Sequence, residues 1–241
     1  MWGPAHAILS LLFPEGCPLC EQPLDEGCRA GVCSACWGEV RPSAGSRCLR
    51  CGFPYGPCGK GEGPLCLSCA RRAPAYDAGI SFGAYAGRLA AVLRLLKYGG
   101  MPGIAGPLAD AILAHRPCAD FLHGAQLLVP VPLHPRRRRE RGHDQAVELA
   151  RALGLRLRLP VAEALRRVRA TPPQVGLAAL ERRSNLRGAF AARRDSRGLS
   201  GRVVCLVDDV WTTGSTLEEA ARALRAAGPA AVLAFSAARA L

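Results

Sequence analysis

Apolar and polar positions alternate in a regular way from residue 76 onward. Four apolar runs have the length and composition of buried strands, at residues 79–85, 125–132, 202–209 and 230–237. Between and after them, apolar residues recur every three or four positions and predict helices over residues 88–98, 104–115, 142–153 and 215–228. Because strands alternate with helices, we predict a parallel α/β sheet with helices on both faces.

The first part of the chain is organised by cysteines instead. Ten of the twelve cysteines lie between residues 17 and 69, and eight of these form the CxxC pairs Cys17/Cys20, Cys33/Cys36, Cys48/Cys51 and Cys66/Cys69. A CxxC turn presents two thiolates to one ion, and two such turns complete a tetrahedral Zn²⁺ site. We therefore predict two structural zinc sites, with the pairs taken in sequential order. An interleaved arrangement, first pair with third, uses the same residues and stays open.

Four thiolates leave no open coordination position, so these sites predict a scaffold or docking surface and not a catalytic metal. We expect Cys28 and Cys58, in the intervening loops, to be uninvolved thiols, and Cys118 and Cys205 to be packing residues. The sequence RRAPAY at residues 71–76 marks a linker. We place a domain boundary there, giving a double zinc ribbon with a short N-terminal helix over 1–75 and a second domain over 76–241.

Composition and charge limit the partners. With 49% hydrophobic and 21% charged residues the chain is of ordinary globular composition, and its early apolar stretch AHAILSLLF is too short to span a bilayer. We expect a cytoplasmic protein without a membrane span. Residues 1–75 carry seven Lys or Arg against six Asp or Glu, so nearly all of the net charge of +13 falls on residues 76–241. This basic surface permits an anionic ligand or a nucleic acid as partner.

The strand at 202–209 ends in two carboxylates, Asp208 and Asp209, which a core does not tolerate unpaired. A run of hydroxyl residues and a glycine then leads directly into a helix: Thr212, Thr213, Gly214, Ser215 and Thr216. Hydroxyls, backbone N–H groups and the helix N-terminus thus converge on one spot, which suits a phosphate. We expect the two acids beside it to face ribose hydroxyls or hydrated Mg²⁺. Helix capping alone accounts for the hydroxyl run but not for the acids.

Taken together, these motifs resemble the ComF/GntX-like branch of the type I phosphoribosyltransferases, which joins an N-terminal zinc ribbon to a strand, two acids and a Thr-Thr-Gly loop. Further motifs of that family occur here in order: Lys97 after an early helix, VPVPLH at 129–134, RGHDQ at 141–145, the pattern of Arg169, Thr171 and Gln174, Arg182 or Arg183 with Asn185, and Phe190. His143 and Asp144 stand where the family has Phe and Asn. They add a titratable group and a negative charge where a diphosphate would approach.

The resemblance implies a type I phosphoribosyltransferase-like fold and an enzyme that binds phosphoribosyl pyrophosphate (PRPP) with Mg²⁺. It would transfer ribose-5-phosphate to an unidentified acceptor, with a link to competence, the uptake and handling of transforming DNA. The resemblance assigns the catalytic acids and ribose contacts to Asp208 and Asp209 and the 5-phosphate to residues 212–216. It assigns the diphosphate to Lys97, Arg136, Arg141 and Gly142. By analogy, the segment from Arg167 to Asn185 is a loop that closes over the substrate.

Two functions of other classes stay open. The run from Arg136 to Arg139 reads either as a solvated loop or as a contact for diphosphate or single-stranded DNA, so a nucleic-acid-binding competence protein is an alternative. A PRPP sensor without catalysis is another. His134 and His143 lie near the predicted site, and a structural role is the simpler expectation for both.

Overall fold

The computed structural model describes residues 16–55, 64–169, 187–193 and 196–241, apart from the side chains of residues 196 and 197. The helix expected before Cys17, together with Cys58, lies outside these ranges. So does most of the expected closing loop, including Thr171, Gln174 and Asn185. Among the helices that are described, none combines the length and the apolar character needed to cross a bilayer.

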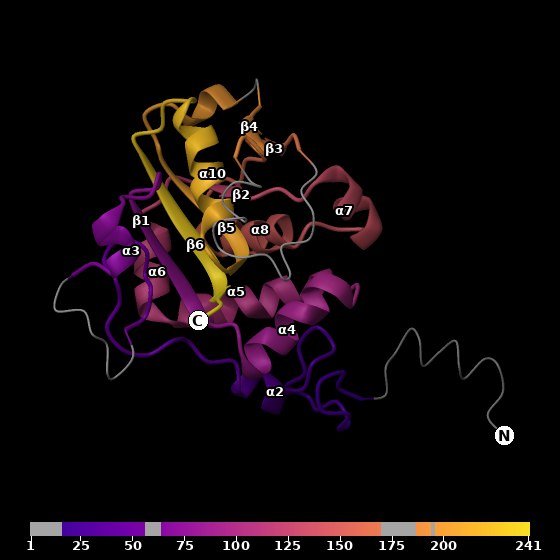
Figure 1. The fold of residues 1–241 in the computed structure, drawn as a ribbon. Coiled ribbons are helices and arrows are strands. Elements are labelled where there is room, and N and C mark those ends of the chain that lie inside the picture. Colours follow the sequence, from indigo (N-terminus) through magenta and orange to yellow (C-terminus); the bar gives the residue numbers. More distant parts are fainter. Residues whose placement is uncertain (1–15, 56–63, 170–186, 194–195) are drawn as a thin grey trace.

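A four-stranded parallel sheet forms the centre of the molecule, as the strand and helix pattern predicted (Figure 1). Its strand order is β1-β6-β5-β2, with bounds Ala78–Ala84, Ala231–Arg239, Val203–Trp211 and Leu127–Pro130. β5 lies between two partners and continues to Trp211, past the end predicted at residue 209. Asp208 and Asp209 therefore lie within β5, near its end, and the pairing of β5 with β6 fixes their backbone.

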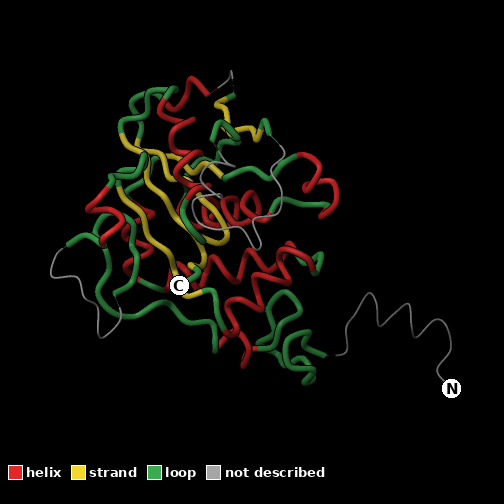
Figure 2. Tube along the Cα trace, in the orientation of Figure 1, coloured by secondary structure: helices red, strands yellow, loops and turns green. Residues whose placement is uncertain are grey.

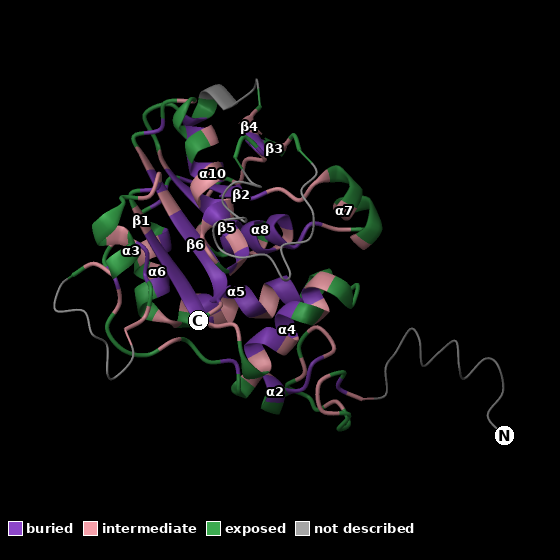
Figure 3. Ribbon diagram, viewed as in Figure 1, coloured by how far each residue is buried: buried purple, intermediate pink, exposed green. Residues whose placement is uncertain are grey.

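Each face of the sheet has its own core. Buried residues follow the strands of the sheet and the helices beside it (Figure 3). One core contains side chains of α4 (Gly87–Tyr98), η1 (Pro102–Ile104), α5 (Ala105–Ala114), α6 (Arg116–His123) and α8 (Gln145–Leu157). The other contains α10 (Ser215–Arg225) and the antiparallel pair β3 (Leu165–Arg167) and β4 (Phe190–Ala192). Helices on both faces were predicted, and this arrangement confirms them.

Alternation along β5 distributes its side chains between the two cores. Cys205 and Val207 enter the core of α4 and α8, and Val204 and Leu206 enter the core of α10. Successive side chains of a strand point to opposite faces. The two acids that follow therefore start toward different sides of the sheet, although they are adjacent in the sequence.

Sequence patterns did not predict several short elements. α7 (Pro135–Arg141) is almost entirely charged and exposed, so no apolar periodicity marks it. α6 and η2 (Ser196–Leu199) span only eight and four residues. The β3–β4 pair joins segments more than twenty residues apart in sequence, and each strand has three residues, too few to show alternation.

The two cysteine-rich ribbons are mostly loop, with the short helices α2 (Ser34–Gly38) and α3 (Leu67–Arg71) (Figure 2). The first ribbon, residues 16–40, packs into the core of α4 through Cys17, Val32 and Val40. The second ribbon, residues 47–71 as far as they are described, packs into the core of α10 through Cys48 and Cys51. Each ribbon thus completes a different hydrophobic core of the sheet domain.

Candidate functional site

The two acids at the end of β5 are stabilised by a lysine from the neighbouring helix. Asp209 is 5% exposed, and its Oδ2 lies 3.1 Å from Nζ of Lys97, which comes from the last turn of α4. Burial alone would lower the pKa of Lys97, but the charge and the hydrogen bond of Asp209, together with the charge of Asp208, outweigh it and the pKa is raised. Lys97 is therefore charged, and it neutralises one of the two acids.

For Asp208, the described part of the chain provides no such cationic partner at contact distance. Burial, reinforced by the negative charge of Asp209, raises its pKa to about 8. The backbone N–H of Asp209 donates to Asp208 Oδ1 at 2.9 Å, which offsets only part of the cost. Carboxylate oxygens suit a hydrated Mg²⁺ and also ribose hydroxyls. Two acids held this way favour a cationic or hydroxyl-bearing ligand.

Residues 212–216, the hydroxyl loop, lie between β5 and α10. Gly214 is the N-cap of α10 with φ of +80°, a conformation that favours glycine. Thr213 Oγ1 and Ser215 Oγ are 2.9 Å apart, and the Ser215 N–H faces Thr213 Oγ1 at 3.4 Å. Gly214 makes the turn, so Ser215 and Thr216 follow the N-cap and neither caps the helix with its side chain. Both hydroxyl residues therefore lie within the first turn of α10.

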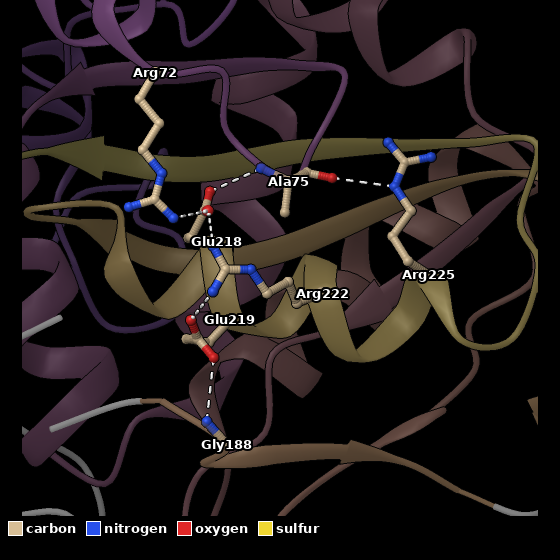
Figure 4. A network of polar contacts seen from close by, with 7 residues as sticks. All are labelled: Arg72, Ala75, Gly188, Glu218, Glu219, Arg222 and Arg225. Atoms are coloured by element: carbon tan, nitrogen blue, oxygen red, sulfur yellow. Dashed lines mark hydrogen bonds and ion pairs between the residues drawn. The ribbon is translucent and has the colours of Figure 1, made fainter. Parts of the chain in front are cut away.

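The first turns of α10 are fixed by ionic contacts (Figure 4). Glu218 Oε2 accepts the N–H of Ala75 at 2.8 Å, and Glu218 Oε1 contacts Arg222 at 2.6 Å. Glu219 Oε2 accepts the N–H of Gly188 at 3.2 Å, which ties the helix to the chain leading into β4. An eleven-residue helix fixed at its beginning holds its N–H groups in one direction, as an anion site requires.

The residues expected at the diphosphate have different surroundings in the structure. The Arg141 guanidinium stacks on Tyr98 at 4.7 Å, beside Lys97, and donates to Gln145 at 3.1 Å. Gly142 ends α7 with φ of +77°. Arg136 points away: its side chain is 77% exposed and pairs with Glu140 at 2.9 Å. The structure therefore places Arg141 against the C-terminal end of α4, where Lys97 also lies, and leaves Arg136 on the surface.

The negative charge of Asp144 is directed into the protein. Its side chain is buried at the N-cap of α8, where it accepts the N–H groups of Leu133 at 2.8 Å and Ala146 at 3.2 Å. Burial nevertheless raises its pKa, since desolvation outweighs these hydrogen bonds. Asp144 thus anchors the chain after β2 to α8. Asp144 therefore repels an approaching diphosphate less than the sequence alone suggested.

Both histidines near the site have structural contacts. His134 caps α7, where its Nδ1 accepts the N–H of Arg136 at 3.3 Å. His143 lies between the carbonyl oxygens of Arg141 and Leu96 and so connects α7 with α4. Neither contact points to proton transfer.

A cavity of about 420 Å³ adjoins the chain that follows β2. It is lined on one side by Pro132 and Leu133 and on the other by Leu165 and Arg167 of β3. The Arg167 guanidinium lies 5.5 Å from the Phe190 ring centre. The charge of Asp208 acts on it to raise its pKa, against the lowering by burial. The sequence did not predict this side of the cavity, because the strands β3 and β4 are too short to show a periodic pattern. Arg167 is therefore a residue of this cavity that is linked electrostatically to Asp208.

The eight CxxC cysteines form two tetracysteine sites in sequential order. The first comprises Cys17, Cys20, Cys33 and Cys36, and the second comprises Cys48, Cys51, Cys66 and Cys69. In each, the four sulfurs lie within 4.8 Å of one another, and contacts of 3.6 to 3.8 Å join sulfurs of different pairs. A tetrahedron with sulfurs about 2.3 Å from zinc has edges of about 3.8 Å, so both sites fit Zn²⁺.

The remaining described cysteines stand apart from both sites. Cys28 belongs to neither group, and Cys118 and Cys205 are fully buried in the core of α4. Their packing role agrees with the expectation from sequence.

Comparisons with known proteins cover both parts of the chain. The double zinc ribbon family matches residues 8–70, and the phosphoribosyl transferase domain family matches residues 141–240. The DNA utilization protein YhgH of Escherichia coli K12 is 35% identical over 230 residues, covering 92% of this chain and 96% of that protein. Competence protein F of Haemophilus influenzae is 32% identical over 218 residues, covering 87% and 91%.

Among solved structures, a glutamine PRPP amidotransferase from B. subtilis matches with a TM-score of 0.37 at 17% identity. The match covers 59% of this chain and 30% of that chain.

The raised pKa of Asp208 predicts a pH-dependent cost in stability. The unfolded carboxyl loses its proton near pH 4 and the folded one near pH 8, so stability falls as the pH rises between these values. Asp208→Asn removes this loss. We expect its melting temperature, relative to the unmodified protein, to rise by at least about 3 °C from pH 5 to pH 8. Calorimetric scans at several pH values measure the difference, and a difference that stays constant contradicts the prediction.

The tetracysteine sites predict a stoichiometry that separate substitutions resolve. The intact protein is expected to hold two zinc ions, and Cys33→Ser or Cys66→Ser is expected to hold one. Elemental analysis of purified protein measures the ratio. Cys28→Ser is the matched control from outside both sites and is expected to retain both ions; its loss of an ion would show that the ligand assignment is incomplete.

Proposed function

The chain belongs to the ComF family, and on that premise we propose that it binds PRPP with Mg²⁺ and transfers ribose-5-phosphate to an acceptor. One observation carries the proposal: Lys97 pairs with Asp209 at the end of β5, and the hydroxyl loop leads directly from there into α10. In parallel α/β sheets, ligands bind outside the carboxyl ends of the strands. We also retain the boundary near residue 75 as a proposed division into two domains.

In this proposal each group of the site has one task. The hydroxyl loop and the N-terminus of α10 hold the 5-phosphate, and Asp208 and Asp209 hold the ribose hydroxyls. Lys97 and Arg141 face the diphosphate, with the backbone at Gly142 beside them. Arg136 is the weakest assignment, because it reaches the diphosphate only after leaving Glu140.

The reaction breaks the bond from C1 of ribose to the diphosphate oxygen, and the electron pair leaves with the diphosphate. A lone pair of the acceptor forms the new bond to C1, and the acceptor releases one proton. Mg²⁺, when bound with PRPP, would neutralise charge on the leaving group. The protein's own contribution is to hold the two ends of PRPP so that C1 is presented to the acceptor.

We place this activity in the cytoplasm, since the eight metal-binding thiols have to stay reduced. The relatives are named for DNA utilization and for competence. We propose that this chain serves the same process, with the acceptor supplied by the handling of DNA or nucleotides.

Ligand binding to the proposed site predicts a thermal shift. Mg²⁺ with PRPP at about 100 times its dissociation constant is expected to stabilise the protein by about 2.7 kcal/mol. Asp209→Asn is expected to lose most of this gain, because it breaks the contact with Lys97 and removes an acid from the ribose site. Each shift is measured against the same variant without ligand.

Asp120→Asn provides the control, as Asp120 is an exposed acid paired with Arg116 on α6. Absence of any shift in the intact, zinc-loaded protein would refute PRPP binding. Binding without release of diphosphate, across a panel of acceptors, would instead identify a PRPP sensor.

A second function is favoured by α7, which presents consecutive arginines on an exposed helix. Contact with single-stranded DNA through these residues predicts salt-dependent binding. Replacing Arg136 to Arg139 by Ser is expected to lower the salt slope by about 0.7 for each arginine that contacts a phosphate. Fluorescence anisotropy at several salt concentrations measures it. Arg116→Ser controls for loss of a distant surface charge, and an unchanged slope in the α7 variant removes this function.

A further inference from the structure

Arg239 is a buried cation at the end of β6. It is 8% exposed, and its Nη1 donates to the carbonyl oxygen of Cys51 at 2.7 Å, while Nη2 lies 3.8 Å from Cys51 Sγ. The only sequence signal for it is a charge at the end of an otherwise apolar strand. Arg239 thus joins the last strand of the sheet to the second tetracysteine site.

The counter-charge of Arg239 comes from that site. Within the described ranges no Asp or Glu makes an ion pair with Arg239. A buried charge is costly unless it is compensated. With Zn²⁺ bound, the four thiolates would carry a net charge of about −2, and Cys51 would be the thiolate that Arg239 contacts. Metal binding at the second site would therefore stabilise the position of Arg239.

Two aromatic rings hold the guanidinium in place. It lies 4.3 Å from the ring centre of Trp211 and 5.1 Å from that of Phe53. Trp211 is the register partner of Arg239 on β5, and Tyr76 packs edge-on against it at 5.4 Å. A planar guanidinium stacks on aromatic faces in a way that an ammonium does not. The position of the Trp211 indole consequently depends on Arg239.

Trp211 in turn shapes the hydroxyl loop. A Cβ placed on Gly214 would lie 2.7 Å from Nε1 of Trp211, so the loop is packed directly onto the indole. The same glycine is the N-cap of α10. A shift of the indole therefore moves the turn that aims the first N–H groups of the helix.

A second connection runs through the linker that follows Cys69. Arg72 lies 3.9 Å from Glu218, and the Ala75 N–H donates to Glu218 in the first turns of α10 (Figure 4). Arg225 returns to the Ala75 carbonyl at 3.1 Å. The second ribbon therefore reaches the same helix from two directions.

The first ribbon is connected differently. Arg88 of α4 donates to the Leu19 carbonyl at 2.8 Å, but a carboxylate, Glu39, pairs with it at 2.9 Å. Arg88 therefore has a counter-charge that does not depend on the metal. It also lies at the opposite end of α4 from Lys97.

We propose that Arg239 is a positioning residue that couples metal binding at the second tetracysteine site to the shape of the hydroxyl loop. The second site, unlike the first, then sets the affinity for PRPP. This inference rests on the proposed PRPP binding at the hydroxyl loop.

The test compares Arg239→Lys with Arg88→Lys in the full chain. Arg239→Lys keeps the charge beside Cys51 but cannot stack flat between Trp211 and Phe53. We expect both variants to retain two zinc ions by elemental analysis. Arg239→Lys is expected to weaken binding of PRPP with Mg²⁺ roughly tenfold by calorimetry, and Arg88→Lys is expected to leave it unchanged. Cys66→Ser is expected to match Arg239→Lys, and Cys33→Ser is expected to keep the affinity.

A second measurement does not use PRPP. Amide hydrogen exchange of residues 212–217 is expected to accelerate roughly fivefold in Arg239→Lys and to stay unchanged in Arg88→Lys. Equal exchange in both variants overturns the coupling, and so does unchanged PRPP affinity in a folded, zinc-loaded Arg239→Lys. If the unmodified protein binds no PRPP, the proposed function fails, and the exchange comparison still decides the coupling.

Discussion

The buried ion pair between Lys97 and Asp209 is the contact on which the candidate site depends. A parallel strand covered on both faces has no room for an unpaired charge, yet β5 carries two at its end. Lys97 compensates one, and the other retains its proton to unusually high pH. The site can therefore stay compact without a ligand. Burying the two acids costs stability, and a strand with apolar residues at these positions would not have that cost. Such strain is typical of positions kept for binding.

The two ribbons are integral parts of the fold and not appendages. Each supplies buried side chains to one face of the sheet, and among the described residues neither ribbon has a core separate from those of the sheet. Small metal-bound segments depend on their ligands for stability, because they bury too little apolar surface. The linker predicted at residues 71–76 marks where the cysteine pattern stops. It does not imply that the two parts move independently.

Much of the fold was readable from the sequence because its signals are local. The apolar strands, the amphipathic helices and the CxxC pairs are each recognisable within a few residues, and the hydroxyl run after Asp209 predicts the candidate site in the same way. The rest depends on contacts between distant segments. Nothing near Lys97 indicates that it pairs with Asp209, and nothing near Arg239 indicates a cysteine as partner. α7 and the β3–β4 pair lack periodicity and are held by tertiary contacts.

The strand order has a consequence for how the chain acquires its structure. β1 is the first strand of the sheet in the sequence, but it pairs with β6, the last of the described strands. More than 150 residues separate paired positions such as Ser81 and Ser236. β1 therefore has no sheet to join until β6 inserts between β1 and β5. Pairings of such long sequence separation form slowly and leave apolar edges open in the meantime. During synthesis, the sheet is thus completed only after β6 has been made, and until then the apolar residues of β1 stay exposed.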